Sequence, residues 1–377
     1  MRIPLFKIYH DSKDVESITS SIKRGMQWAA GPNIEKFETL ISKKVGRKYT
    51  VVFNSGTSAL HALLLAYNIK SGDEVIVPSF SFIATANTPL FVGAKPVFAD
   101  IEKLTYGLDI EDVKRKITNK TKAIMPMHYG GAVSLHINEL RALAKEHKLL
   151  LIEDAAESYG AKLNGKKAGT FGDAAMFSFC QTKVFTTGEG GCIVLDSKDI
   201  YEKLKLIRSH GRVETKEYFN SGEYMDYVSL GYNFRMADCL ASLGISQLQK
   251  VNKIIKIRRE KAKYFTSILL KTNTSEIIIP NFPNNLFHVY QEYHIKINSG
   301  KNKRDELKKY LWKKGIGTRI SFLPIHKTHF YKNILGYNNI LKNTEYISEQ
   351  TLTLPLYPDL KKTEMDYIAK EIKNFFS

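Results

Sequence analysis

Residues 149–191 have the sequence LLLIEDAAESYGAKLNGKKAGTFGDAAMFSFCQTKVFTTGEGG. The apolar runs LLLIED and AAMFSF predict two buried strands, and each run ends at polar residues. Outward from this stretch, between Thr50 and Leu195, apolar runs alternate with segments that have helical spacing. Further strands are expected at TVVF, EVIVP, PVFAD, KAIMPMH and CIVL, and helices at GTSALHALLLAYN, FIATANTPLFV and INELRALAKEHK. This alternation predicts an α/β domain with a mainly parallel, mixed sheet covered by helices.

The length of 377 residues suggests one large and one smaller domain. Helix-favouring sequence follows Met236, and KIIKIRREKAKYFTSIL, from about Asn252, predicts a helical connector. Beyond it, YQEYHIKI predicts a strand and RDELKKYLWKK a helix. We expect residues 1–250 to form an N-terminal segment and the large domain, and residues 251–377 to form the connector helix and a small α+β domain. The N-terminal segment should pack against one or both domains.

The composition, with 43% hydrophobic and 25% charged residues, is that of an ordinary globular protein. No apolar run reaches the roughly eighteen residues of a membrane span, and the start MRIPLFKIYHDSKDVE lacks the pattern of a signal peptide. We therefore expect a cytoplasmic protein without a membrane partner. Cys180, Cys192 and Cys239 are odd in number and lack metal-ligand spacing, so neither a disulfide framework nor a metal site is expected.

The formal net charge of +18 suggests an anionic partner, which could be nucleic acid or a small phosphorylated ligand. The positive excess is concentrated after residue 250, where a solvated basic surface is the simpler interpretation. The sequence has no helix-turn-helix, zinc-finger or RNP-like pattern. We therefore expect no nucleic-acid partner.

Three polar residues of the opening stretch have complementary chemistry. Asp154 ends a strand at the carboxyl edge of the sheet, where open α/β folds bind ligands. Its carboxylate could pair with a protonated pyridine nitrogen, or it could cap a helix. Lys183 follows the next strand, close to Ser178 and the glycine-rich TTGEGG. A partly buried lysine amine there could form a Schiff base and act as a general acid and base, whereas a solvated surface lysine could not.

A third element is NSGTSALHALLLA at residues 54–66, where a strand ends in a small-residue turn that opens directly into a helix. Gly56, Thr57 and Ser58 can offer N–H groups and hydroxyls to a phosphate, although the same residues also serve as ordinary helix caps. A partner for a pyridine nitrogen, a Schiff-base lysine and a phosphate turn together predict a site for pyridoxal 5'-phosphate. Asp154 and Lys183 are its expected catalytic residues.

The chain resembles the DegT/DnrJ/EryC1/StrS family of pyridoxal-phosphate-dependent nucleotide-sugar aminotransferases. The resembling motifs are NSGTSALHALLLA, GDEVIVPSFSFIATAN, GAKPVFADIE, LIEDAAESYGA, FSFCQTKVFTTGEGG and GYNFRMADCLASLGISQLQKV. The resemblance extends from AAGPNIEKFE to LTLPLYPDL and implies an aspartate-aminotransferase-like fold of type I. It also implies that Lys183 holds the cofactor as a Schiff base, that Asp154 contacts the pyridine nitrogen, and that Ser178 contacts the phosphate together with residues 56–58.

The resemblance assigns three further cofactor residues. Phe82 matches an aromatic residue that stacks on the cofactor, although a core phenylalanine is the alternative. Glu157 occupies a position near the cofactor's phenolic oxygen, where a carboxylate needs a shared proton or water. Asn233 matches a residue that reaches the neighbouring subunit's phosphate, which implies a homodimer with shared active sites. Other residues that could lie near a substrate, but are left outside the catalytic assignment, are His128, Tyr129, Arg319, His326 and His329.

The implied reaction transfers the amino group of L-glutamate to a nucleotide-diphosphate-linked keto-deoxysugar. The Ser-Gly-Thr form of the phosphate turn favours a 4-keto-6-deoxyhexose, because many relatives that act at C3 have a GTDAL-like turn. Amination of a C3 keto sugar or of a cyclitol stays open. Lys183 argues against sugar dehydration, which occurs in relatives with histidine at this position, and the missing DNA-binding motif argues against a DNA-binding regulator.

Overall fold

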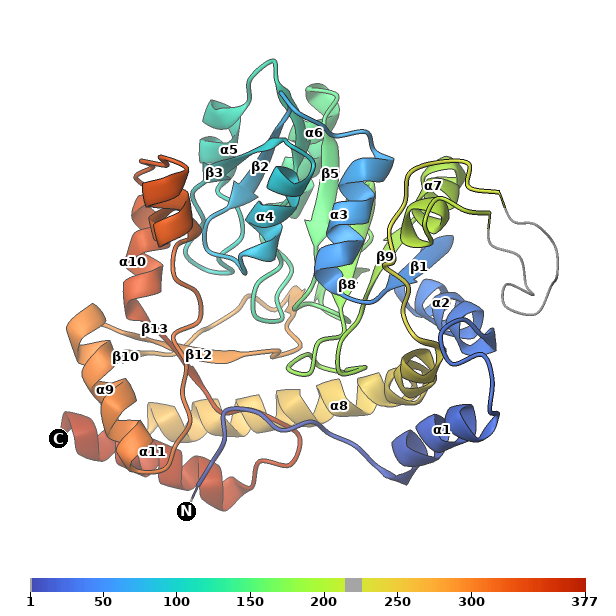
Figure 1. Ribbon diagram of the computed structural model, residues 1–377. Coiled ribbons are helices and arrows are strands. Elements are labelled where there is room, and N and C mark those ends of the chain that lie inside the picture. Colours follow the sequence, from blue (N-terminus) through green and yellow to red (C-terminus); the bar gives the residue numbers. More distant parts are fainter. Residues whose placement is uncertain (1, 214–225) are drawn as a thin grey trace.

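The computed structural model describes residues 2–213 and 226–377 (Figure 1). Its largest sheet has seven strands in the order β1-β9-β8-β5-β4-β2-β3. Within this sheet β9 runs antiparallel to both of its neighbours, whereas the pairs from β8 to β3 are parallel. The α/β class with a mainly parallel, mixed sheet is thus confirmed. The strands are β1 (Tyr49–Phe53), β2 (Glu74–Pro78), β3 (Lys95–Ala99), β4 (Thr121–Ile124), β5 (Leu150–Asp154), β8 (Ala174–Ser178) and β9 (Gly191–Leu195).

These strands confirm the seven apolar runs that the sequence analysis selected. The run KAIMPMH ends its regular pairing at Ile124, because Pro126 has no N–H group for a sheet ladder. Met127 nevertheless forms an isolated bridge with Asp154, so this segment still follows the neighbouring strand. The three predicted helices of this region are present as α3 (Gly56–Ala66), α4 (Ala84–Phe91) and α6 (Ile137–Glu146).

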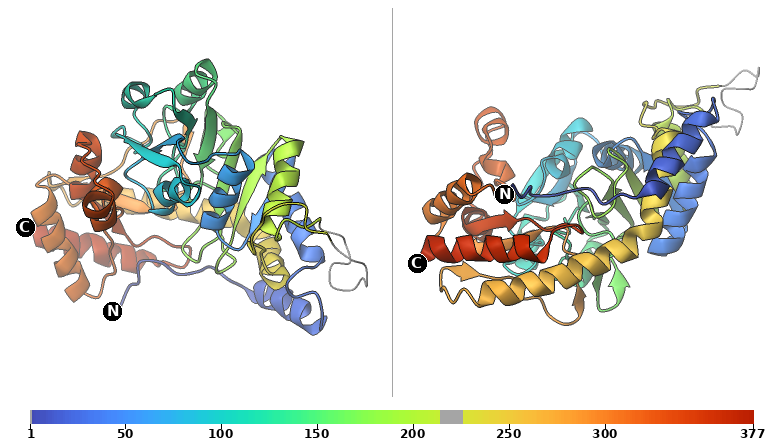
Figure 2. Two further views of the ribbon diagram at one scale, coloured as in Figure 1. Left: turned by 45° about the horizontal axis from the view of Figure 1, so that its top comes forward. Right: turned by 90° about the horizontal axis from the view of Figure 1, so that it is seen from below.

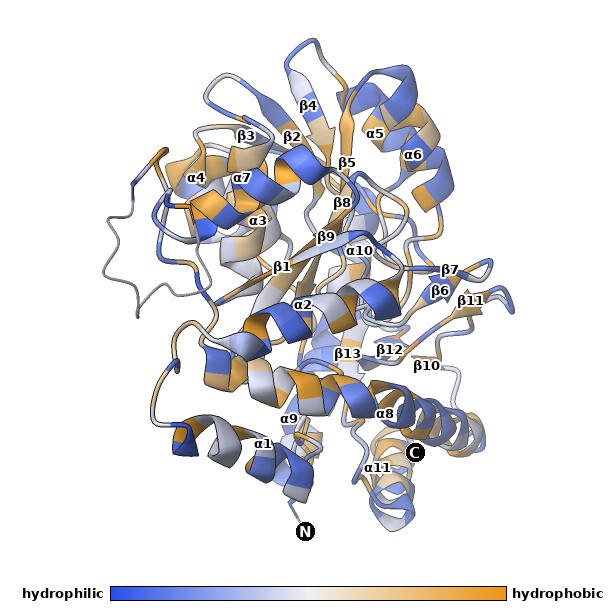
Figure 3. Cartoon of the chain, turned by 90° about the vertical axis from the view of Figure 1, so that its right-hand side faces the viewer, coloured by the Kyte–Doolittle hydropathy of each residue, from blue (hydrophilic) through white to orange (hydrophobic). Residues whose placement is uncertain are grey.

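Helices cover both faces of the seven-stranded sheet. One core joins α3, α4 and α7 (Lys198–Arg208) to the sheet, and a second joins α2 (Pro32–Val45), α5 (Ile110–Lys116), α6 and part of α8 (Asp238–Leu270). Residues of β1 alternate between them, with Val51 and Phe53 in one core and Val52 in the other. Burial on both faces explains why these strands are continuous apolar runs. In Figure 3 the hydrophobic colour is strongest on β5 and its neighbours, whereas the outer helices also carry hydrophilic residues.

Helix α8 is 33 residues long and extends beneath the sheet toward the C-terminal part of the chain (Figures 1 and 2). Leu248 and Val251 belong to a core of the large sheet, whereas Phe265 and Leu269 belong to a separate core. The expected boundary between residues 250 and 251 therefore lies inside one continuous helix. The division into two domains at this position stays a prediction.

The C-terminal part contains a further core, separate from the two cores of the large sheet, around a three-stranded sheet of order β10-β12-β13. The predicted strand YQEYHIKI and helix RDELKKYLWKK are present as β12 (Tyr293–Ile297) and α9 (Lys301–Lys313). The remaining elements here are β10 (Ile277–Ile278), β13 (Thr351–Leu354), α10 (Lys342–Gln350), α11 (Lys362–Phe376), the 3-10 helix Ile325–Lys327 and the π-helix Phe330–Ile334. A small sheet of β11 (Leu286–Phe287), β6 (Lys162–Leu163) and β7 (Lys166–Lys167) links this part to the loop after β5.

The N-terminal segment contacts both parts, in agreement with the expectation from the sequence. Near the start, Ile3 pairs with Ile316 as an isolated bridge. Helix α1 (Ser12–Lys23) then lies along α8, where Asp14 accepts a hydrogen bond of 2.7 Å from Ser246 Oγ. The segment thus runs as a strap from the C-terminal core to the beginning of α8 (Figure 2).

Candidate functional site

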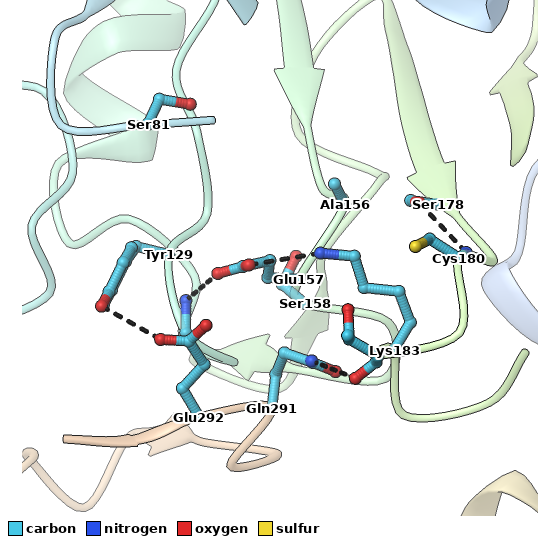
Figure 4. A network of polar contacts seen from close by, with 12 residues as sticks. Ser81, Tyr129, Ala156, Glu157, Ser158, Ser178, Cys180, Lys183, Gln291 and Glu292 are labelled. Carbon is cyan, nitrogen blue, oxygen red and sulfur yellow. Dashed lines mark hydrogen bonds and ion pairs between the residues drawn. The ribbon is translucent and has the colours of Figure 1, made fainter. Parts of the chain in front are cut away.

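Three of the predicted site residues, Glu157, Ser178 and Lys183, lie at or beyond the carboxyl ends of strands β5 and β8 of the seven-stranded sheet (Figure 4). Asp154 ends β5, Ser178 ends β8, and Lys183 lies in the loop between β8 and β9. Carboxyl ends of neighbouring parallel strands meet at one edge, so the alternation of strands and helices itself brings these residues together. Glu157 follows Asp154 by three residues and meets Lys183 there.

Asp154 is 3% exposed and held by two hydrogen bonds. Thr85 Oγ1 donates to Asp154 Oδ2 at 2.7 Å, and the N–H of Ala156 donates to Oδ1 at 3.2 Å. Burial raises the pKa of the Asp154 carboxyl, an effect opposed by the Thr85 hydrogen bond and the nearby Lys183 charge. Turns rather than a helix follow β5, so the alternative interpretation of Asp154 as a helix N-cap is wrong.

The Lys183 amine points into the site rather than to solvent. Its Nζ lies 3.2 Å from Glu157 Oε1, and the exposed fractions of the two side chains are 16% and 5%. The other oxygen of Glu157 accepts a hydrogen bond of 2.9 Å from the N–H of Gly130. The interpretation of Lys183 as a solvated surface charge is therefore wrong. The ion pair also gives Glu157 a geometric partner that its sequence position did not reveal.

The loop that carries Lys183 is fixed from the C-terminal part of the chain. Gln291 Nε2 donates a hydrogen bond of 2.7 Å to the carbonyl oxygen of Thr182. The carbonyl oxygen of Gln291 in turn accepts from Arg258 Nη2 at 2.8 Å. Gln291 was not predicted from the sequence, because a polar residue just before a strand has many ordinary explanations. These contacts hold the backbone of the lysine loop in place.

The turn that opens α3 has free hydrogen-bond donors beside Ser178. Ser55 Oγ accepts from the N–H of Ser58 at 3.0 Å, as a helix N-cap does. Among the described residues, no acceptor is bonded to the N–H groups of Gly56 or Thr57. A Cβ added at Gly56 would lie 2.9 Å from Met176 Sδ and 3.3 Å from Ser178 Cβ, so this helix end is pressed against β8. The capping and anion-binding interpretations of the turn are thus compatible.

Phe82 and Asn233 lie at the surface of the single chain. Phe82 is 60% exposed, so the alternative of a core phenylalanine is wrong. Asn233 is also exposed, and its carbonyl oxygen accepts a hydrogen bond of 3.3 Å from Asn54 Nδ2, next to the turn before α3. Asn233 therefore lies next to the turn before α3, and both residues are exposed on the single chain.

A second group of polar residues adjoins Glu157, and only part of it was predicted from the sequence. Glu292 is ion-paired with Arg319, and its Oε2 accepts hydrogen bonds of 3.2 Å from the Tyr129 hydroxyl and from Thr353 Oγ1. Tyr129 and Arg319 had been named as residues that could lie near a substrate. Glu292 had not been named, although a charged residue at the start of an apolar strand is an available signal.

The three named histidines have different surroundings. His128 Nε2 lies 2.9 Å from Glu153 Oε2, and both side chains are fully buried. The N–H of Ser134 donates to His128 Nδ1 at 3.1 Å, which favours the tautomer with the proton on Nε2. His326 is bonded to Ser79 and Glu345, and His329 to Asn333. All three histidines therefore have structural contacts.

Replacement of Glu153 by glutamine is expected to destabilise the protein by about 2–4 kcal/mol. The Glu153 carboxylate accepts backbone hydrogen bonds of 2.7 Å from Gly169, Phe171 and Gly172, besides the His128 contact. Burial opposes its charge, but the His128 contact and these N–H groups keep the pKa below its usual value. In Glu153→Gln one carboxylate oxygen becomes an NH₂ group that faces N–H donors. Urea unfolding at neutral pH measures the difference in free energy.

A matched control is Glu111→Gln, because the Glu111 side chain is 64% exposed. Its unfolding free energy should stay within about 0.5 kcal/mol of the original. A lowered carboxyl pKa stabilises the fold above the unfolded-state pKa, and this contribution is lost as pH falls through the folded-state pKa. The Glu153→Gln difference should therefore shrink on acidification. Equal stability of Glu153→Gln and the original protein at neutral pH would contradict the argument.

The described part of the chain offers neither a cluster of metal ligands nor a helix that could span a membrane. In residues 2–213 and 226–377, no group of three or more His, Cys, Asp or Glu side chains is arranged to hold a metal ion. The helices of the same ranges include none that is both long and apolar enough to cross a membrane.

The chain matches the model of the DegT/DnrJ/EryC1/StrS aminotransferase family over residues 9–373. It is 37% identical to GDP-perosamine synthase from Vibrio cholerae, over 100% of this chain and 99% of that protein. Its fold matches Helicobacter pylori PseC, an aminotransferase involved in the biosynthesis of pseudoaminic acid, with a TM-score of 0.93, 28% identity, and coverage of 100% and 99%. It also matches the PLP-form of Spr1654 from Streptococcus pneumoniae, with a TM-score of 0.92, 25% identity, and coverage of 100% and 98%.

Proposed function

Because the chain belongs to the DegT/DnrJ/EryC1/StrS family and is thus a pyridoxal-phosphate-dependent sugar aminotransferase, we propose that it aminates a nucleotide-diphosphate-linked 4-keto-6-deoxyhexose with L-glutamate as donor. The observation that carries this proposal is the largely buried amine of Lys183, paired with Glu157 at the sheet edge that also holds Asp154. The name of the Vibrio relative supports a nucleoside-diphosphate-linked product. The Ser-Gly-Thr turn supports C4, with a C3 keto sugar or a cyclitol as the alternative.

The residues present fit pyridoxal phosphate. The unmatched N–H groups of Gly56 and Thr57, beside the Ser178 hydroxyl, suit a phosphate at a helix N-terminus, and Ser58 adds a second hydroxyl. The buried Asp154 carboxylate suits a protonated pyridine nitrogen, and the exposed ring of Phe82 suits stacking. When bound, the cofactor accepts the electron pair released at the substrate carbon. Lys183 would attach it covalently through Nζ.

Lys183 is also the residue that we expect to move protons. In the proposed reaction Lys183 Nζ takes the proton from the α-carbon of the donor and would pass it to the bound cofactor. Glu157 holds Nζ at 3.2 Å, and Gly130 fixes Glu157 through its N–H, so the amine stays within the site when it is free. Before the cofactor is attached, the positive charge of Lys183 balances the negative charge of Glu157.

We further propose a homodimer in which Asn233 completes the partner's site. The segment that carries Asn233 also exposes large apolar side chains, since Tyr227 and Leu230 are 61% and 82% exposed. Phe91, which is 52% exposed, adjoins this segment through the ring of His61. Exposed apolar groups that lie together are typical of protein interfaces. The cytoplasmic location expected from the sequence stays a prediction.

Mixed dimers of Lys183→Ala and Asn233→Ala chains are expected to regain activity. In a shared site the Lys183 of one chain works with the Asn233 of the other, so each mixed dimer contains one intact site. Random mixing makes about half of the dimers mixed, which should restore about a quarter of the original activity. The rate is measured after the two inactive proteins are unfolded together and refolded. A mixture no more active than its components would exclude a shared site.

The acceptor is tested by incubation of the purified protein with L-glutamate and a series of keto-sugar nucleotides. Mass spectrometry identifies the products that gain an amine. We expect conversion of a 4-keto-6-deoxyhexose linked to a nucleoside diphosphate. Amination of a C3 ketone alone would overturn the C4 assignment, and no amination of any keto sugar would overturn the proposed function.

A further inference from the structure

A small cavity of about 40 Å³ adjoins Lys183 on the side of the C-terminal part of the chain. Its lining includes Lys183, Gln291, Glu292, Arg319 and Thr353. Figure 4 shows that Lys183, Gln291 and Glu292 converge from different segments. An anionic group that enters this space would meet the cationic side chains of Lys183 and Arg319.

In the structure the Arg319 guanidinium is paired with a carboxylate of the protein itself. Arg319 Nη2 donates to Glu292 Oε1, and the exposed fractions of the two side chains are 41% and 4%. The second Glu292 oxygen is held by the hydroxyls of Tyr129 and Thr353. Glu292 is thus fixed by three donors from three segments and presents a carboxylate to the guanidinium.

Arg319 still has unused hydrogen-bonding capacity. Its Nε is buried and has no hydrogen-bond partner among the described residues. Its backbone is fixed to β13, because Arg319 N donates to the Thr353 carbonyl at 3.2 Å and Thr353 N donates to the Arg319 carbonyl at 2.8 Å. A guanidinium on a fixed backbone, with spare N–H groups, is suited to bind a carboxylate through two hydrogen bonds.

The proposed reaction places two chemically different substrates in one site. The donor, L-glutamate, carries carboxylates, whereas the keto group of the acceptor belongs to a sugar ring. The Glu292 side chain is 4% exposed, so a charged Glu292 carboxylate left without Arg319 while the sugar is bound would be costly. An internal carboxylate that returns to the arginine avoids this cost.

We propose that Arg319 binds a carboxylate of the amino donor and that Glu292 is the internal carboxylate that replaces it when no carboxylate ligand is present. This inference rests on the proposed function and adds the residues that let one site accept both substrates. Arg319 contacts the donor directly. Glu292 acts through Arg319 and is a positioning residue.

The exchange of carboxylates at Arg319 is coupled to protonation of Glu292. Burial and the neighbouring Glu157 raise the pKa of Glu292, and the charges of Arg319 and Lys183 oppose this rise. When a ligand carboxylate pairs with Arg319, the arginine no longer lowers the pKa of Glu292, and Glu292 gains a proton. Because binding takes up this proton, the affinity for a dicarboxylate should fall as pH increases. The titratable or charged groups that face Glu292 are Glu157, Lys183, Arg319, Tyr129 and Arg258.

Glutarate tests the inference without the reaction, because it has two carboxylates and no amino group. Its dissociation constant for the cofactor-loaded protein is measured by calorimetry at several pH values. Arg319→Gln is expected to weaken glutarate binding by about 10- to 100-fold, the range for loss of a charge-assisted pair. Glu292→Gln should bind glutarate more tightly than the original protein and with less dependence on pH, because the competing charge and its proton are removed.

Lys203→Gln is the matched control, because Lys203 lies on the surface in a helix pair with Asp199 and is not part of the cavity lining. It should change glutarate binding by less than about threefold, as expected for a screened surface charge. An equal loss in Lys203→Gln and Arg319→Gln would show a general charge effect and overturn the inference. Glutarate affinity in Arg319→Gln equal to that of the original protein would overturn it as well.

Single-turnover experiments separate an altered fold from an altered donor site. Arg319→Gln should slow amino-group uptake from glutamate while its pre-loaded form delivers the amine to the keto sugar at the original rate. Equal slowing of both half-reactions would overturn the inference. If the original protein binds glutarate through Arg319 but aminates no keto sugar, the proposed function fails and the carboxylate site stands.

Discussion

A Lys183→Ala variant is expected to lose sugar amination by about 10⁴-fold or more, because one side chain supplies both the covalent attachment and the proton transfers. The structure makes replacement by another lysine implausible. The Lys183 amine is paired with Glu157 at 3.2 Å, and its loop is tied to Gln291 through Thr182. The rate of amino-sugar formation is followed by mass spectrometry at saturating glutamate and keto sugar.

A second measurement shows whether the cofactor is attached at this residue. Borohydride reduction followed by proteolysis should yield a peptide that contains Lys183 and carries the cofactor mass. In Lys183→Ala no peptide should carry it. Lys203→Ala is the control, because Lys203 forms an exposed helix pair with Asp199, and it should keep both the labelled peptide and the original rate. Transamination by Lys183→Ala at close to the original rate would remove Lys183 from the mechanism.

The sequence was sufficient to predict the residues that end strands of the large sheet. Asp154 and Ser178 each terminate a run of buried apolar residues, and such runs are recognisable because both faces of the sheet are covered. Parallel pairing alone then places the carboxyl ends of these strands at one edge of the sheet, so no other feature of the fold is needed to predict it. Lys183 follows from the same logic, because it lies only a few residues beyond β8.

Residues that reach the site from distant segments could not be predicted in this way. Gln291 and Glu292 lie more than one hundred residues beyond Lys183, and their place depends on how the C-terminal part packs against the large sheet. Thr85 was missed for another reason, since a threonine within a helical run has no chemical signature until its hydroxyl is seen to bond Asp154. The pairing of Glu157 with Lys183 likewise depends on loop geometry.

An Asp154→Asn variant is expected to lose about 10³-fold in sugar amination, the order of effect for removal of one preorganised electrostatic group from an active site. Asparagine keeps the size of the side chain and can still form a hydrogen bond with Thr85. The Thr85 hydroxyl can accept this bond and donate its own proton to Ser81 Oγ, which lies 2.6 Å away. The variant lacks the negative charge proposed to hold a proton on the pyridine nitrogen. The initial rate of amino-sugar formation measures the loss.

The same substitution should leave the cofactor-free protein at least as stable as the original. Burial raises the pKa of Asp154, so in the interval between its unfolded and folded pKa values the folded state holds a proton that the unfolded state has released. Stability contributed by this residue therefore falls as pH rises through that interval, and asparagine does not ionise. We expect a urea midpoint for Asp154→Asn equal to or above that of the original protein at neutral pH.

A lower rate together with an unchanged or higher urea midpoint distinguishes a functional carboxylate from a structural one. A carboxylate that held the fold together would lower the urea midpoint when neutralised, as expected for Glu153, whose pKa is lowered rather than raised. Asp199→Asn, at an exposed position, controls for the loss of a charge and should change neither quantity. A lower midpoint together with an unchanged rate in Asp154→Asn would show that Asp154 supports the sheet edge and that another group serves the cofactor ring.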